Sequence, residues 1–113
     1  MQTLSHRISI FVPSTFECNK PAKRMQARET KRAAKYLCSY FGGCTAQRAE
    51  GYWVSDTKGL IKEAQNIVFS ACTEADKETH TAKVLAYAKR LARRMKQEAI
   101  TVQLDDTLIF VEG

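Results

Sequence analysis

The sequence lacks long apolar runs, and this excludes a membrane-spanning helix. No segment of its 113 residues approaches the roughly 20 consecutive apolar residues with which a helix crosses a bilayer. The first residues, MQTLSHRISIFVPS, also lack the charged-then-apolar pattern of a signal peptide. We therefore expect no membrane partner and a location in the cytoplasm.

Closely spaced cysteines are absent too. Cys18, Cys38, Cys44 and Cys72 are separated by 20, 6 and 28 positions, and none of them forms a CxxC pair. Zinc ribbons and dithiol redox motifs both need such pairs, so neither is indicated. We expect four reduced and mostly buried thiols, because a free cysteine usually packs as a small apolar side chain.

Histidines and phosphate-binding glycine motifs are equally scarce. His6 and His80 lie far apart in the sequence and share no carboxylate-rich neighbourhood, which argues against a metal site. The pair Gly42-Gly43 follows a predicted helix, whereas a phosphate-binding loop precedes one. The sequence thus predicts no metal and no cofactor.

The composition that remains is that of a single globular domain. Hydrophobic residues make up 44% and charged residues 27% of the chain, which is close to the average for folded domains. At this length folding buries well over half of the surface of the unfolded chain. We expect one domain, residues 1–113, with one core.

The hydrophobic pattern predicts alternating strands and helices. Residues 4–12 alternate with period two, which predicts a strand closed by Pro13. A helical period begins at Pro21 or a few residues later and ends at Gly42-Gly43. Residues 45–55 and 60–72 are strand-like and flank the turn sequence SDTKG.

A second helix and a terminal hairpin complete the pattern. Thr73 or Asp76 can cap a helix that runs to about residue 97, and two strands then meet at Asp105-Asp106. The order β-α-β-β-α-β with one extra strand predicts an α+β fold of ferredoxin-like type. In such a fold both helices lie on one face of an antiparallel sheet.

Positive charge is concentrated on the two predicted helices. The net charge is +6, with seven Lys and Arg against Glu29 over residues 20–35, and seven against Glu78 and Glu98 over residues 77–98. A cationic helical layer attracts polyanions, although Lys and Arg are also ordinary helix-forming residues on a solvated face. The candidate nucleic-acid or anion-binding residues are Arg24, Arg28, Lys31, Lys35, Lys83, Arg90 and Arg94.

Catalytic groups are harder to find. Ser14 and Thr15 follow the first strand, but no histidine can be assigned to activate either hydroxyl, so acyl transfer is unsupported. Asp105 and Asp106 fit a turn better than a catalytic pair of carboxylates. These observations favour a protein that is not an enzyme.

Two resemblances add to this picture. The stretch SIFVPST is similar to the first ribonucleoprotein motif of RNA-recognition modules, in which Phe11 would stack on a base. The second motif of these modules has a glycine and two aromatic residues in the third strand, where this sequence has only the aromatic Phe69. IFVPST, YFGGCTAQRAEGYWVS and KGLIKEAQNIVFS resemble a family of small proteins found in bacteria, their plasmids and their phages, which has no established activity. That resemblance implies a ferredoxin-like sandwich, and this chain departs from the family in its heavier Lys/Arg content and in Asp105-Asp106. The positions that match its motifs are Pro13, Ser14, Thr15, Gly42, Gly43, Thr45, Gly51 and Trp53.

Three functions remain open at this point. The leading hypothesis is a non-enzymatic protein that binds nucleic acid, or another acidic surface such as an acidic protein, through the helical face. The second is an interaction protein that binds another protein or forms a homodimer through its open sheet face, with Phe11 and Trp53 as exposed aromatics. The third is a small-ligand or enzyme site near Ser14, Thr15 and residues 42–53, where Thr45 is a further candidate.

Overall fold

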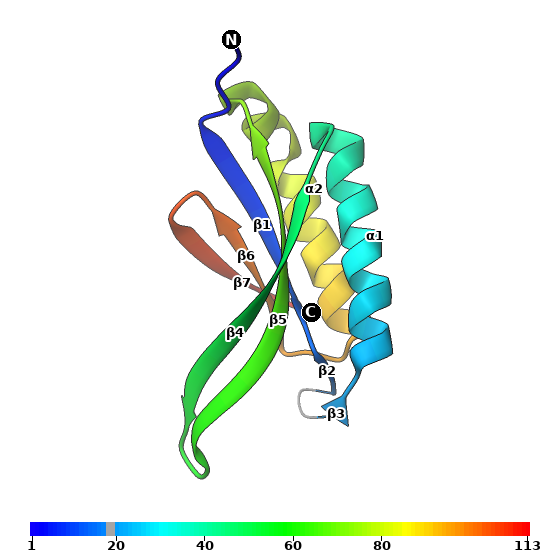
Figure 1. Ribbon diagram of the computed structural model, residues 1–113, viewed down its shortest axis with the longest axis vertical. Helices are drawn as coiled ribbons and strands as arrows, with labels where there is room; N and C mark the ends of the chain where they lie inside the picture. The colour runs from blue at the N-terminus through cyan, green and yellow to red at the C-terminus, as the bar shows by residue number, and fades with distance from the viewer. Residues whose placement is uncertain (18–19) are drawn as a thin grey trace.

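Two helices cover one face of a five-stranded antiparallel sheet in the computed structural model of the chain (Figure 1). The structure describes residues 1–17 and 20–113, so Cys18, one of the thiols expected to be reduced and buried, lies outside the described residues. The strand order is β4-β5-β1-β6-β7, and each neighbouring pair is antiparallel. An α+β fold with both helices on one face was predicted and is confirmed.

The order of the elements follows the hydrophobic pattern of the sequence closely. A two-stranded ribbon of β2 and β3 was not predicted, because strands of two residues leave no periodic signal. The elements are β1 (His6–Pro13), β2 (Thr15–Phe16), β3 (Lys20–Pro21), α1 (Lys23–Phe41), β4 (Thr45–Ser55), β5 (Gly59–Cys72), α2 (Glu74–Arg94), β6 (Ala99–Leu104) and β7 (Thr107–Glu112).

Local chemistry sets the ends of the helices. Gly42 ends α1 with a left-handed φ of 86°, and its amide donates to the Cys38 carbonyl oxygen at 2.9 Å. Glycine has no Cβ to oppose that conformation, so the predicted helix stop is confirmed. At the start of α2 the Thr73 hydroxyl accepts a hydrogen bond from the Asp76 amide at 3.2 Å. None of the helices in the described ranges is long and apolar enough to cross a membrane.

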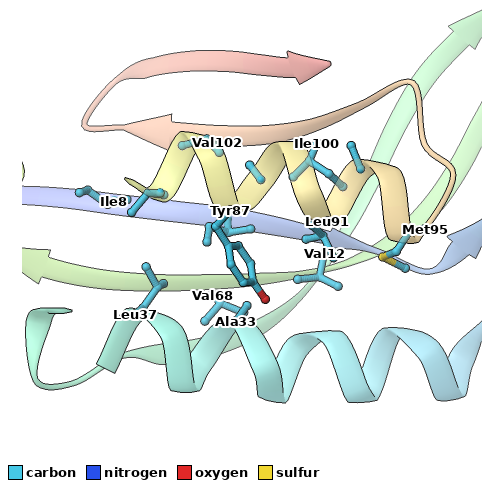
Figure 2. Close-up of a cluster of buried hydrophobic side chains, with 14 of the residues drawn as sticks. Ile8, Val12, Ala33, Leu37, Val68, Tyr87, Leu91, Met95, Ile100 and Val102 are labelled. Carbon is cyan, nitrogen blue, oxygen red and sulfur yellow. The ribbon is translucent and has the colours of Figure 1, made fainter. Parts of the chain in front are cut away.

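The core lies between the sheet and the two helices (Figure 2). Ile8, Ile10 and Val12 occupy alternate positions of β1 and are fully buried, together with Leu37 of α1 and Leu91 of α2. Burying one such side chain stabilises the folded state by about 1.5–3 kcal/mol. The alternation therefore fixes which face of β1 the helices cover, and it leaves the positions between these residues on the open face of the sheet.

The β4–β5 hairpin projects well beyond the helices, at the lower end of Figure 1. It stretches the molecule to 49 × 25 × 22 Å. Tyr52 and Trp53 point to opposite faces of β4, and we expected one of them to pack under the helices. That expectation was wrong: the two residues are 56% and 53% exposed, because neither helix reaches this part of the hairpin.

Candidate functional site

The open face of the sheet carries most of the side chains that could form a site. Directly paired residues of an antiparallel ladder share a face. Phe11 is paired with Ile67, Gly51 with Glu63, and Trp53 with Ile61. All of them therefore lie on the face that the helices leave open.

Glu63 is the one carboxylate among these paired positions, and Thr15 of β2 contacts it. The Thr15 hydroxyl donates to Glu63 Oε1 at 3.3 Å. The Gln97 side-chain amide, which follows α2, donates to the Thr15 carbonyl oxygen at 2.9 Å and lies 3.4 Å from its hydroxyl oxygen. The strand β2, the middle of β5 and the segment after α2 are thus tied together beside one half-buried carboxylate.

Three neighbouring hollows meet at Glu63 and Thr15. The largest, about 480 Å³, is lined by both residues and by Trp53, Ser55 and Lys62 among others. A second, about 170 Å³, shares Glu63 and is lined also by Phe11, Gln65 and Gln97. A third, about 220 Å³, shares Thr15 and includes Ser14, Gln26 and Arg48. The largest falls within the size range of small-molecule sites.

Gly51 keeps the middle of the hairpin free of a side chain. A glycine inside a predicted strand indicates either a bulge or a close backbone approach. Gly51 is paired with Glu63 without interruption of the ladder, so there is no bulge here. A Cβ at this position would lie 3.3 Å from the Gln65 amide nitrogen, which supports the alternative expectation of a close approach. We conclude that Gly51 makes room for the side chain of Gln65 and the backbone carbonyl of Glu63.

The predicted ligand residues divide between two ends of the sheet. Phe11, Ser14, Thr15 and Trp53 line the connected hollows around Glu63. Thr45 lies eight positions before Trp53 on β4, roughly 27 Å away at the rise of an extended strand. It lines a separate hollow of about 260 Å³ with residues such as Phe41 and Phe69.

Sequence reasoning overlooked Glu63, Gln65 and Gln97. A usable signal existed for the first two, because they alternate with Ile61 and Ile67 along a predicted strand. Polar residues at positions of a strand that otherwise alternate as apolar indicate that this part of the face is not buried against other apolar side chains. Gln97 gave no signal, since its contact with Thr15 joins residues 82 positions apart.

The cationic residues lie on the two helices, which cover the face of the sheet opposite to Phe11, Glu63 and Trp53 (Figure 1). None of the seven candidates lines the three hollows at Glu63 and Thr15. Arg94 is not a free surface cation: its Nε lies 3.0 Å from Glu29 Oε2, and the Glu29 side chain is only 2% exposed. The remaining candidates are exposed, namely Arg24, Arg28, Lys31, Lys35, Lys83 and Arg90.

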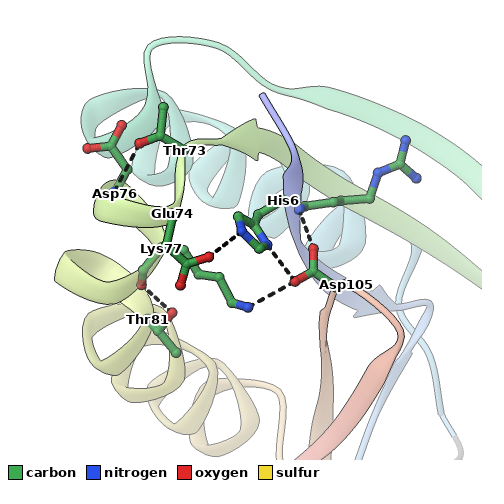
Figure 3. A network of polar contacts seen from close by, with 8 residues as sticks. His6, Thr73, Glu74, Asp76, Lys77, Thr81 and Asp105 are labelled. Atoms are coloured by element: carbon green, nitrogen blue, oxygen red, sulfur yellow. Dashed lines mark hydrogen bonds and ion pairs between the residues drawn. The ribbon is translucent and has the colours of Figure 1, made fainter. Parts of the chain in front are cut away.

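A polar network at the opposite end of the sheet was also missed (Figure 3). His6 was expected to have no carboxylate neighbours, but its Nδ1 lies 2.8 Å from Asp105 Oδ2 and its Nε2 contacts Glu74. Lys77 Nζ lies 2.9 Å from the same Asp105 oxygen. The hydrogen bond from Lys77, followed by those from His6 and the Arg7 amide, holds the pKa of Asp105 well below its usual value.

This network fixes the β6–β7 turn rather than forming a reactive centre. The turn at Asp105-Asp106 was predicted and is confirmed, and Asp105 adopts a left-handed φ of 54° there. A hollow of about 600 Å³ opens beside it, but each carboxylate of the network already has a cationic or imidazole partner. Within residues 1–17 and 20–113, no group of three or more His, Cys, Asp or Glu could hold a metal ion.

Comparison with known proteins gives one clear relationship. The sequence matches no protein-family profile and no curated protein. Two solved structures match over the whole of this chain and 95% of theirs: a phage SAM lyase in complex with S-methyl-5′-thioadenosine, with a TM-score of 0.71 and 21% identity, and a phage SAM lyase in the apo state, with a TM-score of 0.69 and 20% identity. At this identity the likeness shows a shared fold.

These matches correct the leading interpretation of the sequence. A non-enzymatic nucleic-acid-binding protein was wrong, as was the expectation that the chain is not an enzyme, because the fold that it shares from end to end is that of an enzyme with a small-molecule ligand. The physical reason for the error is that the Lys and Arg stripes served as evidence of a ligand although a solvated helical face explains them equally well. The third hypothesis, a small-ligand or enzyme site, agrees better with the matches.

Proposed function

We propose that this protein is a lyase that cleaves S-adenosylmethionine and releases S-methyl-5′-thioadenosine, with its site in the hollows around Glu63, Thr15 and Trp53. The observation that carries the proposal is the full-length structural match to phage SAM lyase, one structure of which contains S-methyl-5′-thioadenosine. The same comparison and the strand order β4-β5-β1-β6 support a ferredoxin-like classification of the sheet.

The groups around the largest hollow suit this substrate. S-adenosylmethionine carries a sulfonium and an ammonium cation, a carboxylate and an adenine ring. Glu63 supplies a negative charge for a cation, and the half-exposed Trp53 indole offers a flat surface for the adenine. Lys58 lines the same hollow and offers positive charge to the substrate carboxylate.

The reaction needs no general base from the protein. Release of S-methyl-5′-thioadenosine breaks the bond between the sulfonium sulfur and Cγ of the amino-acid chain. If the substrate's own carboxylate attacks Cγ, the bonding electron pair passes to sulfur, and the products are a neutral thioether and protonated homoserine lactone. Charge and atoms balance without water, a proton transfer or a redox partner. The task of the protein is then to hold the carboxylate in line with the bond that breaks.

The hollow provides surroundings that favour this step. Positive charge on sulfur and negative charge on the carboxylate both disappear as the reaction proceeds, so the transition state is less polar than the substrate. Apolar walls such as Trp53 and Ile61 replace water around these groups. Water stabilises the charged substrate more than it stabilises the less polar transition state. Removing water from around the sulfonium and the carboxylate therefore lowers the barrier to the reaction.

The test is to incubate the purified chain with S-adenosylmethionine and measure S-methyl-5′-thioadenosine and homoserine lactone by liquid chromatography and mass spectrometry. S-adenosylmethionine decomposes slowly in buffer, so buffer alone and heat-inactivated protein are the controls. We expect product formation well above both controls. In heavy water the lactone should carry no deuterium on carbon, because direct displacement removes no carbon-bound proton. A rate equal to that of buffer would refute the proposal.

We also propose that the open sheet face mediates self-association. Leu108 and Phe110 of β7 are 51% and 68% exposed and share this face with Trp53. Exposed apolar side chains gathered on one face usually mark an interface. Sedimentation velocity should give a species larger than the monomer, and Phe110→Ser should shift it toward the monomer; a wild-type protein that remains monomeric at high concentration would end this idea. An acidic protein partner for the helical layer stays a prediction.

A further inference from the structure

Two thiols meet where α1 passes into β4. Cys38 lies in the last turn of α1 and Cys44 immediately precedes β4, and their sulfur atoms are 3.6 Å apart. Cys38 is exposed and Cys44 is half-buried, whereas Cys72 is buried on its own in the core. Of the three cysteines that the structure describes, one is fully buried, which departs from the expectation of mostly buried thiols.

The two sulfurs already interact in the reduced protein. The Cys38 thiol donates to the Cys44 sulfur, and the Cys44 thiol donates to the Ala34 carbonyl oxygen, also at 3.6 Å. Both side chains thus point into the same corner between helix and strand. A disulfide needs the sulfurs at about 2.05 Å, so a small movement closes the gap.

The corner between the two cysteines is built to allow such a movement. Gly42 and Gly43 lie between them, and a Cβ at either position would meet no atom within 4 Å. Glycine also accepts a wider range of backbone angles than any other residue. Cys38 lies outside the buried cluster and Cys44 packs only against its edge, so the corner can adjust while the buried side chains keep their places.

We propose that Cys38 and Cys44 form a redox-sensitive pair that closes into an intramolecular disulfide when the protein meets a peroxide. In the first step the exposed Cys38 thiolate attacks one peroxide oxygen and the O–O bond breaks, which yields a sulfenic acid at Cys38 and a hydroxide ion. The hydroxide takes up the proton that the Cys38 thiol had lost and becomes one water. In the second step the Cys44 sulfur attacks the Cys38 sulfur, and the hydroxyl leaves with the Cys44 proton as a second water. Two thiols are oxidised by two electrons and one peroxide is reduced.

The different surroundings of the two sulfurs assign their roles. Burial, followed by the adjacent Cys38 sulfur, raises the pKa of Cys44 to about 11, so this thiol stays protonated at neutral pH. The thiolate is the reactive form, so Cys44 reacts slowly with free peroxide. It can still attack the sulfenic acid at Cys38, because the two sulfurs are adjacent and the Cys44 proton passes to the leaving hydroxyl. Cys38 reacts first because solvent reaches it, and Cys44 resolves the product because it is the adjacent sulfur.

Trypsin offers a direct test, because cleavage after Lys35 and Arg48 releases a peptide, residues 36–48, that holds both cysteines. The native protein is treated with hydrogen peroxide, its remaining thiols are blocked with iodoacetamide, and the digest is examined by mass spectrometry. We expect this peptide to lose two hydrogen atoms and to carry no iodoacetamide label. Dithiothreitol should restore both labels.

Matched variants separate this pair from the other thiols. Cys72→Ser should close the disulfide as the wild type does, whereas Cys38→Ser and Cys44→Ser should not. Oxidation should raise the Tm of the wild type by about 5 °C, because a short covalent loop restricts the unfolded chain, and should not raise that of Cys38→Ser. Oxygen added to the peptide 36–48 without loss of two hydrogens would overturn the proposal, and so would a cross-link to a different peptide. The proposal does not depend on lyase activity.

Discussion

Replacing Glu63 by Gln removes one charge from the proposed site while keeping the shape of the side chain. A carboxylate and the substrate ammonium, which keeps its charge through the reaction, interact by about 4 kcal/mol when 4 Å apart at an effective dielectric constant of about 20. Glu63 is half-buried and open to solvent at the hollow, so we reduce this figure by about half, to about 2 kcal/mol. Each 1.36 kcal/mol corresponds to a factor of ten, and kcat/KM for S-adenosylmethionine should therefore fall about 30-fold.

Glu50→Gln is the matched control for this experiment. Glu50 lies on the same hairpin but on its opposite face, where it is exposed and pairs with Lys62 at 3.2 Å. The substitution Glu50→Gln changes the net charge by the same amount as Glu63→Gln. Because exposed ion pairs contribute little to the free energy of folding, kcat/KM should stay within about twofold of the wild type. Equal effects of the two substitutions would show that Glu63 does not face the substrate. The lyase activity itself would survive that result, so the site and the function fail separately.

Three further predictions concern the site and the stability of the fold. Trp53→Ala should weaken binding of S-methyl-5′-thioadenosine about tenfold by calorimetry, since stacking of a base on an aromatic ring contributes about 1–3 kcal/mol. Asp105→Asn should flatten the acid limb of a Tm-against-pH curve. The pKa of the Asp105 carboxyl is lowered in the folded protein, so its ionised form stabilises the wild type above the unfolded pKa of about 4. This stabilisation is lost as the pH falls and the carboxyl becomes protonated. Glu29→Met should cost about 2 kcal/mol in urea unfolding, because it leaves the partly buried Arg94 without its carboxylate, and Arg94→Met should cost less, because Arg32 still pairs with Glu29 at 3.1 Å. The cost of the double variant should be smaller than the sum of the two single costs. Additive costs would refute a coupled pair.

Most of the secondary structure could be predicted because local signals agreed with one another. The alternation of Ile8, Ile10 and Val12, the stop at Gly42 and the cap at Thr73 each have a local physical cause, and each is found in the structure. The exposure of Tyr52 could not be predicted in the same way. It depends on how far the helices extend along a hairpin, and this is set by packing between segments distant in sequence.

Charge was the least reliable guide to function. Arg94 belongs to a regular cationic stripe in the sequence, yet in the structure it neutralises Glu29 inside the helical layer. The converse holds for His6, which has no acidic neighbour in the sequence but contacts Asp105, 99 positions away. Net charge along a helix cannot reveal these pairings, because the partner comes from another element.

The missing general base was the strongest argument against an enzyme, and the chemistry of the proposed substrate removes its force. In the cleavage of S-adenosylmethionine the leaving group is a neutral thioether, which needs no protonation, and the nucleophile is the carboxylate of the substrate itself. A protein that catalyses it needs a hollow that excludes water and fixes one conformation, and such a hollow leaves no short catalytic motif. What the sequence does contain is two strands of 11 and 14 residues, about twice the usual length. The core uses only part of these strands. The part of β4 and β5 that lies beyond the core includes Gly51, which is paired with Glu63. Glu63 and Trp53 line the hollow of about 480 Å³ in which we place the substrate.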